Sequence, residues 1–324
     1  MSVGSNTTAL NASPATAAVP ERRSFSRLGR RLPQYMATFA RDPGWLPMFL
    51  LGRLLPVRRA IKLWPVPAVH PGTGESLVAL ERGIADASTA LERDGIATGL
   101  RLKAETLQAI RAFAASAPCY AAADPARPVR VPEGHLSGPP PGLGGSLIAD
   151  YREGIAACPA ISGLWSDPLL LSIATRYLRR PAVLKRSRLW WTFSGLAADQ
   201  EERSTFSIDH FHYDLDDWLC LKFFFYISDV DADAGPHAFI RGSQSRRRLS
   251  HQLTMFKGHS QESLAGLYAP EDFLVLTGPA GTGFAEDPYG FHTGTSPVRR
   301  NRLMLEVEYG MSARRVAGPY GSPR

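Results

Sequence analysis

The chain has 324 residues, of which 44% are hydrophobic and 21% charged, a composition ordinary for a soluble globular protein with a substantial core. Its net charge of +7 is concentrated between Glu21 and Lys62, where ten basic and two acidic residues leave +8 and the rest of the chain −1. The main domain therefore has no basic excess that would indicate nucleic-acid binding.

The three cysteines, Cys119, Cys158 and Cys220, show no metal-type spacing, and an odd number cannot all pair within the chain. A reducing cytoplasm is the simpler environment for them. We find no secretory signal pattern at the start of the chain and no apolar run of about 18 residues that would span a membrane. We therefore expect a cytoplasmic protein, with membrane association left open.

Composition divides the chain into four parts. Residues 1–20 are small and polar and are predicted to be disordered. Residues 21–75 form a basic amphipathic arm and linker, in which prolines break the pattern into short helices. This arm either packs over the main domain or contacts an anionic membrane surface or a partner. Residues 76–316 are expected to form the main domain, and residues 317–324 a C-terminal tail.

The first half of the main domain has mainly helical patterns. We predict helices over 77–92 and 103–115, the second with a moderate apolar face. Residues 125–145 are rich in Pro and Gly and indicate a long loop. A further helix is predicted over 167–178, with Asp167 as its N-cap.

From about Val183 the pattern changes to strands. Apolar runs bounded by turn residues predict strands over 184–193, 219–227, 273–276 and 303–309. Several strands without intervening helices favour an antiparallel sandwich or barrel over a parallel α/β sheet. The expected fold class is mainly β with flanking helices, and the aromatic residues of these strands are expected to form its core.

The sequence Phe211-His212-Tyr213-Asp214 stands just before one predicted strand. On an extended chain, residues i and i+2 project to the same side, so His212 and Asp214 can chelate one ion. The pair alone is weak, because chance would produce such spacing about 0.7 times with 8 histidines and 30 acidic residues. His292 is the best candidate for a third ligand, and two histidines with one carboxylate form an open site suited to Fe(II).

Other residues near this sequence compete for the same roles. His210 could replace His212, and Asp209, Asp216 and Asp217 could replace Asp214. Arg302 opens the last predicted strand, where its planar guanidinium suits the carboxylate of a dicarboxylate co-substrate. Lys222 and Arg188 are polar residues within apolar strands and either face a cavity or extend to water.

Together these segments resemble the phytanoyl-CoA dioxygenase-like family of Fe(II)/2-oxoglutarate oxygenases from about Leu91 to Tyr309. The matching blocks, in family order, are Leu91–Ile96, Phe211–Asp214, Ser228–Val230, Gly235-Pro236, Gly242–Gln244, Gly278–Thr282, Asp287, Phe291–Gly294 and Arg302–Leu305.

Three positions depart from the family pattern. Arg241 replaces a common proline and Gln244 a common histidine, and we expect little effect on iron from either. Gly294 stands where a serine often assists the co-substrate, so Thr293 or Thr295 is expected to take that role.

The resemblance implies a double-stranded β-helix (a cupin-like jelly roll). His212, Asp214 and His292 would hold Fe(II), and 2-oxoglutarate would chelate the metal with its far carboxylate on Arg302. With O2, the co-substrate would be converted to succinate and CO2. The implied reaction is hydroxylation of a small or carrier- or lipid-linked metabolite. The alternatives are a jelly-roll metal enzyme that does not use 2-oxoglutarate and a non-catalytic binding protein.

Overall fold

The protein is described by a computed structural model that covers residues 36–64, 74–196, 208–253 and 258–313. The predicted disordered segment 1–20 and the predicted tail 317–324 lie outside these described ranges, as does most of the proline-rich linker.

The helical elements are mostly short. They are α2 (Trp45–Leu51), α3 (Leu55–Leu63), α4 (Ile84–Asp94), α5 (Ala104–Ser116), η2 (Arg152–Ala157), α6 (Pro159–Leu164), α7 (Pro168–Leu178), η3 (Ala232–Ala234), α9 (Leu249–Gln252), α10 (Gln261–Ala265) and η4 (Pro270–Asp272).

The strands carry most of the core. They are β1 (Val78–Leu80), β2 (Ile96–Leu102), β3 (Cys119–Ala121), β4 (Pro128–Val129), β5 (Ile148–Asp150), β6 (Val183–Thr192), β7 (Cys220–Tyr226), β8 (His237–Ile240), β9 (Phe273–Leu276), β10 (Thr282–Glu286), β11 (His292–Gly294) and β12 (Arg302–Gly310).

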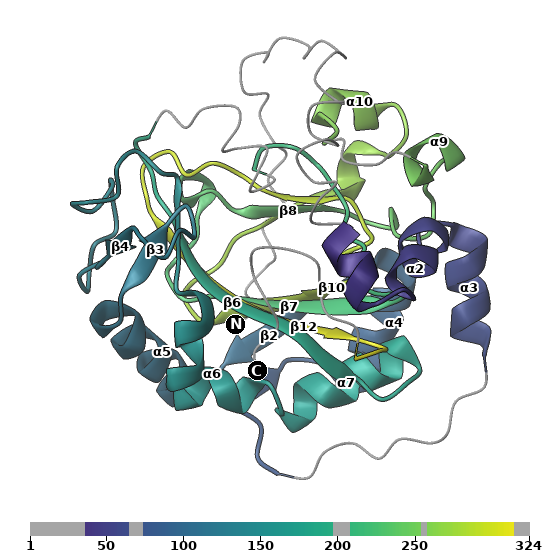
Figure 1. The fold of residues 1–324 in the computed structure, drawn as a ribbon, viewed down its shortest axis with the longest axis horizontal. Coiled ribbons are helices and arrows are strands. Elements are labelled where there is room, and N and C mark those ends of the chain that lie inside the picture. The colour runs from purple at the N-terminus through teal and green to yellow at the C-terminus, as the bar shows by residue number, and fades with distance from the viewer. Residues whose placement is uncertain (1–35, 65–73, 197–207, 254–257, 314–324) are drawn as a thin grey trace.

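Two antiparallel sheets face each other (Figure 1). The larger has nine strands in the order β1-β2-β10-β7-β12-β6-β5-β3-β4, and the smaller has three in the order β11-β8-β9. Phe224 and Phe284 of the larger sheet share a buried cluster with Phe239 of the smaller one. The fold is therefore mainly β with flanking helices, a jelly roll, as the sequence predicts.

Side-chain alternation along β7 defines the two faces of the larger sheet. Phe223 and Phe225 join the cluster on the outer face, whereas Phe224 and Tyr226 join the cluster between the sheets. All seven residues of β7 are buried, because helices cover one face and the smaller sheet covers the other. The sequence prediction that the aromatic runs form core is confirmed. Lys222, two residues before Phe224, points to the same inner face of the sheet.

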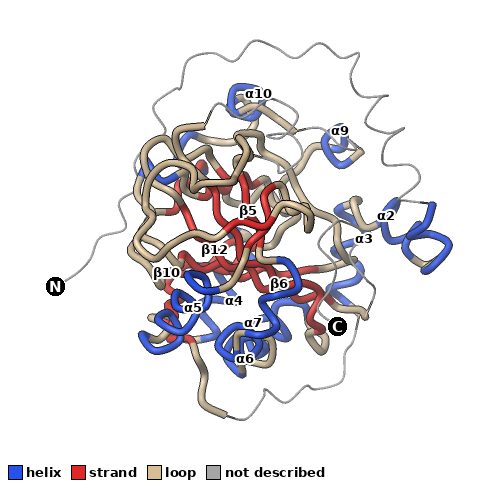
Figure 2. The backbone as a smooth tube through the Cα atoms, turned by 60° about the vertical axis from the view of Figure 1, so that its left-hand side comes forward, coloured by secondary structure: helices blue, strands red, loops and turns tan. Residues whose placement is uncertain are grey.

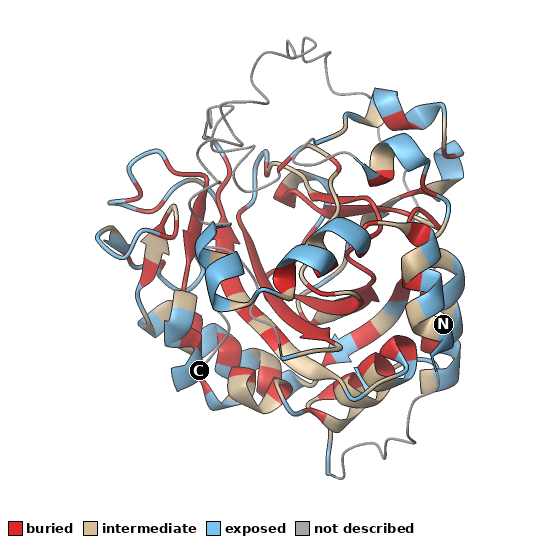
Figure 3. Cartoon of the chain, turned by 45° about the vertical axis from the view of Figure 1, so that its right-hand side comes forward, coloured by how far each residue is buried: buried red, intermediate tan, exposed pale blue. Residues whose placement is uncertain are grey.

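Helices α4, α5, α6 and α7 lie along the outer face of the larger sheet (Figures 1 and 2). The predicted N-cap is present: the Asp167 carboxylate accepts from the amides of Leu169 and Leu170 at the start of α7. The strands are buried between layers, while these helices expose their outer sides (Figure 3).

The predicted helix over 77–92 is wrong in its first half. Val78 to Leu80 form an edge strand whose Val78 pairs with Leu102 of β2. The helix begins only at Ile84, after Gly83 in an extended conformation. The apolar residues at the start of this segment pair with a strand, a tertiary contact that overrides local helical periodicity.

The described part of the N-terminal arm packs against the main domain. The amide of Leu55 donates to Oε1 of Gln252 at 2.8 Å, and Arg58 is buried in an ion pair with Asp287. The packing interpretation of the arm therefore holds for residues 36–64. None of the described helices is both long and apolar enough to cross a bilayer.

Candidate metal centre

The backbone brings His212 and His292 together. The amide of His212 donates to the carbonyl of His292 at 3.0 Å, and the amide of His292 donates back at 2.9 Å. This reciprocal pair is an isolated antiparallel bridge beside β11. The side chains of directly opposed residues in such a bridge lie on the same face, and the two ring centroids are 4.3 Å apart.

Hydrogen bonds orient both imidazoles in the same way. Nδ1 of His212 contacts the carbonyl of His210 at 3.1 Å, and Nδ1 of His292 contacts the carbonyl of Gly290 at 3.0 Å. Since a carbonyl only accepts, each Nδ1 must carry the proton. Each Nε2 then presents its lone pair, the tautomer that a metal requires.

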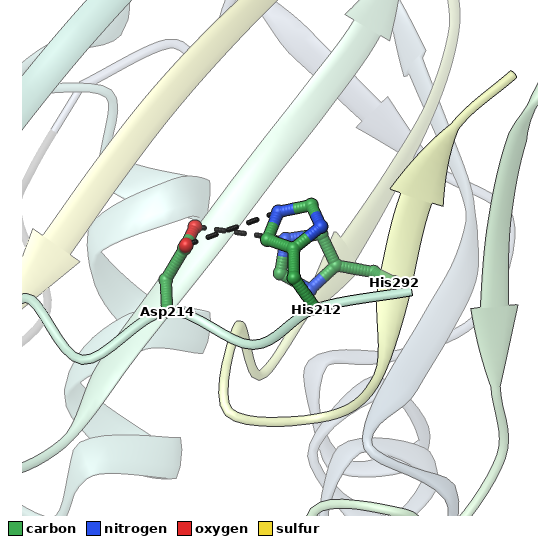
Figure 4. Close-up of side chains that lie close together, drawn as sticks. All are labelled: His212, Asp214 and His292. Atoms are coloured by element: carbon green, nitrogen blue, oxygen red, sulfur yellow. Dashed lines mark ion pairs between the residues drawn. The ribbon is translucent and has the colours of Figure 1, made fainter. Parts of the chain in front are cut away.

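Asp214 completes the group (Figure 4). Its Oδ1 lies 3.9 Å from Nε2 of His212, and its Oδ2 lies 3.6 Å from Nε2 of His292. Atoms bound at roughly 2.1 Å to one ion are at most about 4.2 Å apart, so these separations suit a shared ion. Among the residues that the structure describes, this is the group of three ligand-type side chains close enough to hold a metal.

The surroundings of the three ligands shift their pKa values in different directions. Burial, reinforced by His292, lowers the pKa of His212 to about 3, so this ring is neutral at neutral pH. Burial also opposes a charge on His292, but Glu286 and Asp214 outweigh it and raise its pKa. Burial would raise the pKa of Asp214, yet Lys222 and the two histidines hold it well below its usual value.

Lys222 faces the interior rather than solvent. Its Nζ lies 2.5 Å from Oδ2 of Asp214, and its side chain is 3% exposed. It belongs to a cluster of facing charges on the inner side of the larger sheet, comprising Arg186, Asp214, Asp216, Lys222, Glu306 and Glu308. The four carboxyl groups outnumber the two cations of this cluster, so its charge favours a cation at the histidines.

Arg302 is a buried guanidinium without an acidic partner among the described residues. It donates to the carbonyl of Gly235 and, at 3.3 Å, to Oγ1 of Thr192, while its Nε has no hydrogen-bond partner. Burial lowers its pKa, against the smaller opposing effects of Tyr226 and Asp209. A buried, uncompensated guanidinium fits the carboxylate of a small molecule.

The position of Arg302 relative to the metal ligands follows from β11. A Cβ added to Gly294 would lie 3.1 Å from Nη2 of Arg302. Gly294 is two residues after His292, so the guanidinium sits roughly 6.6 Å along the strand from that ligand, on the same face. This separation is of the order of the length of a five-carbon dicarboxylate. The absence of a side chain at Gly294 leaves room for such a molecule.

The hydroxyls of both predicted threonines donate to backbone carbonyls. Thr293 pairs with Ala238, whose side chain packs in the outer cluster of the smaller sheet, so Thr293 faces away from His292. The hydroxyl of Thr295 donates to the carbonyl of Pro236 at 2.7 Å rather than contacting Arg302. Thr192, opposite Arg302 in the register of β6 and β12, is the threonine that hydrogen-bonds to it.

The competing ligands have other contacts. His210 offers its carbonyl to His212, and Asp209 accepts from the amide and hydroxyl of Ser296. Asp216 lies 3.5 Å from Arg186 within the inner charge cluster. Asp217 is buried and paired with Lys185 at 3.4 Å.

Sequence reasoning missed a buried pair beside the centre. Nε2 of His237 lies 2.9 Å from Oε2 of Glu286, and Oε1 of Glu286 lies 3.8 Å from Nδ1 of His292. Glu286 lies two residues after Phe284 on β10, so its side chain is on the same inner face of the sheet. This alternation is the sequence signal that indicates the buried pair. Arg188 faces the same interior, stacked over Trp190 and bonded to Asp150.

The chain matches no protein-family model and no curated protein sequence. The phytanoyl-CoA dioxygenase-like resemblance therefore remains an interpretation of its motifs.

Solved structures give fold-level similarities. One is EctD from S. alaskensis with 2-oxoglutarate and 5-hydroxyectoine, at 19% identity over 81% of this chain and 86% of that one, with a TM-score of 0.49. Another is the non-heme alpha ketoglutarate dependent epimerase SnoN from nogalamycin biosynthesis, at 16% identity over 72% and 86%, with a TM-score of 0.41. HygX from Streptomyces hygroscopicus, with nickel, 2-oxoglutarate and hygromycin B bound, has 14% identity over 70% and 87% and a TM-score of 0.44.

Proposed function

We propose that this chain is an Fe(II)/2-oxoglutarate-dependent oxygenase. The observation that carries the proposal is the pairing of two sites on one strand face. His292 contributes to a three-ligand group, and Gly294 lies against a buried guanidinium that has no acidic partner in the described chain. A metal chelator with a distal carboxylate satisfies both sites at once.

The donor set fits iron. Two imidazole nitrogens and one carboxylate on one side of an ion leave positions for a chelating co-substrate and O2. His212, Asp214 and His292 would hold the metal, and Arg302 with Thr192 would bind the far carboxylate of 2-oxoglutarate. When bound, iron and 2-oxoglutarate supply the oxidative decarboxylation that activates O2 for attack on a C–H bond.

Solvent reaches the centre from the side of Asp214. The side chains of His212 and Asp214 are 20% and 28% exposed, whereas that of His292 is 5% exposed. Beside them lie Asp216 and Arg186, 17% and 11% exposed. This polar approach supports a small polar metabolite as the substrate, and hydroxylation is the reaction that the motif resemblance implies.

The test is succinate formation from 2-oxoglutarate with Fe(II) and O2, first uncoupled and then with candidate metabolites. The proposal expects turnover by the wild-type protein and none by His212→Ala. Iron binding without conversion of 2-oxoglutarate under any substrate would favour a jelly-roll metal enzyme of another type. A protein that binds no iron after anaerobic reconstitution would favour a non-catalytic binding role.

We also propose that the N-terminal arm, besides packing against the domain, makes peripheral membrane contact. Several large apolar side chains on its described part are exposed, including Leu46, Leu50 and Leu51 on α2 and Trp64 after α3. Basic residues beside such side chains suit an anionic bilayer surface. Co-sedimentation with anionic liposomes should be lost on replacing Leu46, Leu50 and Leu51 with serine; equal binding by both proteins would exclude this contact.

A further inference from the structure

The turn from Asp287 to Gly290, here the 287–290 turn, touches two of the three proposed metal ligands. The backbone amide of Asp214 donates to the carbonyl of Pro288 at 2.8 Å. The imidazole of His292 is oriented by the carbonyl of Gly290 at 3.0 Å. The turn is closed by the amide of Gly290, which donates to the carbonyl of Asp287 at 2.8 Å. Any shift of this turn therefore moves both ligands.

The N-terminal arm holds that turn through Arg58 of α3. Nη2 of Arg58 contacts both carboxylate oxygens of Asp287, at 3.1 and 3.0 Å. Nη1 of Arg58 donates to the carbonyl of Trp218 at 2.9 Å, in the segment that follows Asp214. One guanidinium thus joins the segments that carry Asp214 and His292, because its fork has donors pointing in two directions.

Further contacts surround the same turn. The guanidinium of Arg58 lies 4.1 Å from the ring centroid of Tyr289, and the hydroxyl of Tyr289 donates to the carbonyl of Arg53. Asp287 also accepts from the hydroxyl of Tyr177 at 2.6 Å. Arg58 and Asp287 are both almost fully buried, so their attraction is little screened by solvent.

We propose that the α2–α3 arm is a positioning element of the metal centre, acting through Arg58 on the 287–290 turn. This inference rests on the proposed metal centre and adds a role for the arm beyond covering the domain. Arg58 is a positioning residue: it fixes the backbone that places Asp214 and His292.

The chain offers a matched control next to Arg58. Arg59 is exposed on the same helix, and within the described part of the chain its guanidinium donates to the carbonyl of Ser245 at 3.2 Å. Arg58→Met and Arg59→Met therefore remove the same charge from the same helix, but only the first removes a contact with the 287–290 turn.

The experiment titrates the full-length protein with Co(II) alone and records its affinity and its d–d absorption bands at saturation. Arg58→Met should weaken Co(II) binding roughly ten-fold or more, the scale for groups that orient metal ligands, and should shift the bands. Arg59→Met should change neither. Arg58→Lys should fall between, because an ammonium can pair with Asp287 without also reaching the Trp218 carbonyl.

A folded Arg58→Met protein whose affinity and spectrum equal those of Arg59→Met would overturn the role of the arm. If Arg58→Met does not fold, the same comparison is made with Arg58→Lys and Asp287→Asn, and equality with Arg59→Met again overturns it. His212→Ala separates the two proposals, because it should abolish Co(II) binding. If His212→Ala binds Co(II) as tightly as the wild type, the proposed metal centre itself is wrong.

Discussion

The ammonium of Lys222 lies 2.5 Å from Oδ2 of Asp214, so a proposed metal ligand already has a buried cationic partner. A metal ion and Lys222 neutralise the same carboxylate. The ion pair therefore stabilises the chain before metal is bound and reduces what the metal adds to stability.

Lys222→Met should destabilise the metal-free protein by roughly 3–5 kcal/mol, because it leaves buried carboxylates without their cation. Co(II) should then raise the unfolding midpoint more in this variant than in the wild type, since the metal takes over the charge compensation. Thermal unfolding with and without Co(II) measures both effects. Lys185→Met is the matched control: it breaks the buried pair with Asp217, which includes no proposed ligand, and should leave the Co(II)-induced shift unchanged.

Arg302→Met should weaken 2-oxoglutarate binding roughly 10- to 150-fold, because a hydrogen bond to a charged group contributes about 1.5–3 kcal/mol. The free protein should keep or raise its unfolding midpoint, since the substitution removes a buried charge that has no acidic partner in the described chain. Calorimetric titration of the Co(II)-loaded protein and thermal unfolding provide the two readouts. Unchanged binding would show that the co-substrate carboxylate lies elsewhere.

Glu308 makes stability depend on pH. Burial, reinforced by Asp216, raises the pKa of Glu308 from 4.5 to about 8. The unfolded chain releases this proton above pH 4.5, while the folded chain keeps it until about pH 8, so stability falls across that window as pH rises. Glu308→Gln cannot ionise and should be more stable than the wild type by roughly 2–4 kcal/mol at pH 8 but not at pH 4. Urea unfolding at the two pH values tests this; an equal difference at both would contradict it.

Asp167 joins α7 to the first strand of the domain. Its carboxylate caps α7 and also accepts from the amide of Leu77 at 2.7 Å and the hydroxyl of Ser76 at 2.9 Å. Asp167→Ala should cost ~2–3 kcal/mol in urea unfolding, because it removes an N-cap and leaves a part-buried backbone donor, the amide of Leu77, unpaired. Asp86→Ala, an exposed acid in the first turn of α4 with no capping bond, should change stability by less than about 0.5 kcal/mol.

Much of the fold could be predicted because the strongest local patterns coincide with the buried strands. The apolar runs of β6, β7, β9 and β12 were each placed to within two residues. The strands β1, β3, β4, β5 and β11 cannot be placed, because two or three residues carry too little periodicity. The longer strands β2, β8 and β10 are not predicted either.

The candidate site also contains residues that the sequence predicts and residues that it does not. The spacing of His212 and Asp214 is local and visible in the sequence, and the order of the motifs points to His292. The partner of Arg302 depends on strand register, so Thr192 could not be chosen over Thr293 from the sequence. The Arg58–Asp287 pair joins residues 229 positions apart, and no local pattern encodes such a contact.

The reciprocal bridge between His212 and His292 has a consequence for assembly of the protein. Its two strands come from distant parts of the chain, and closing so long a loop costs entropy before the contact forms. In the unfolded chain the two histidines are separated, so an ion meets single ligands of low affinity. A bound metal would therefore stabilise the finished jelly roll by slowing its unfolding, while the rate at which the strands find their register would be set without it.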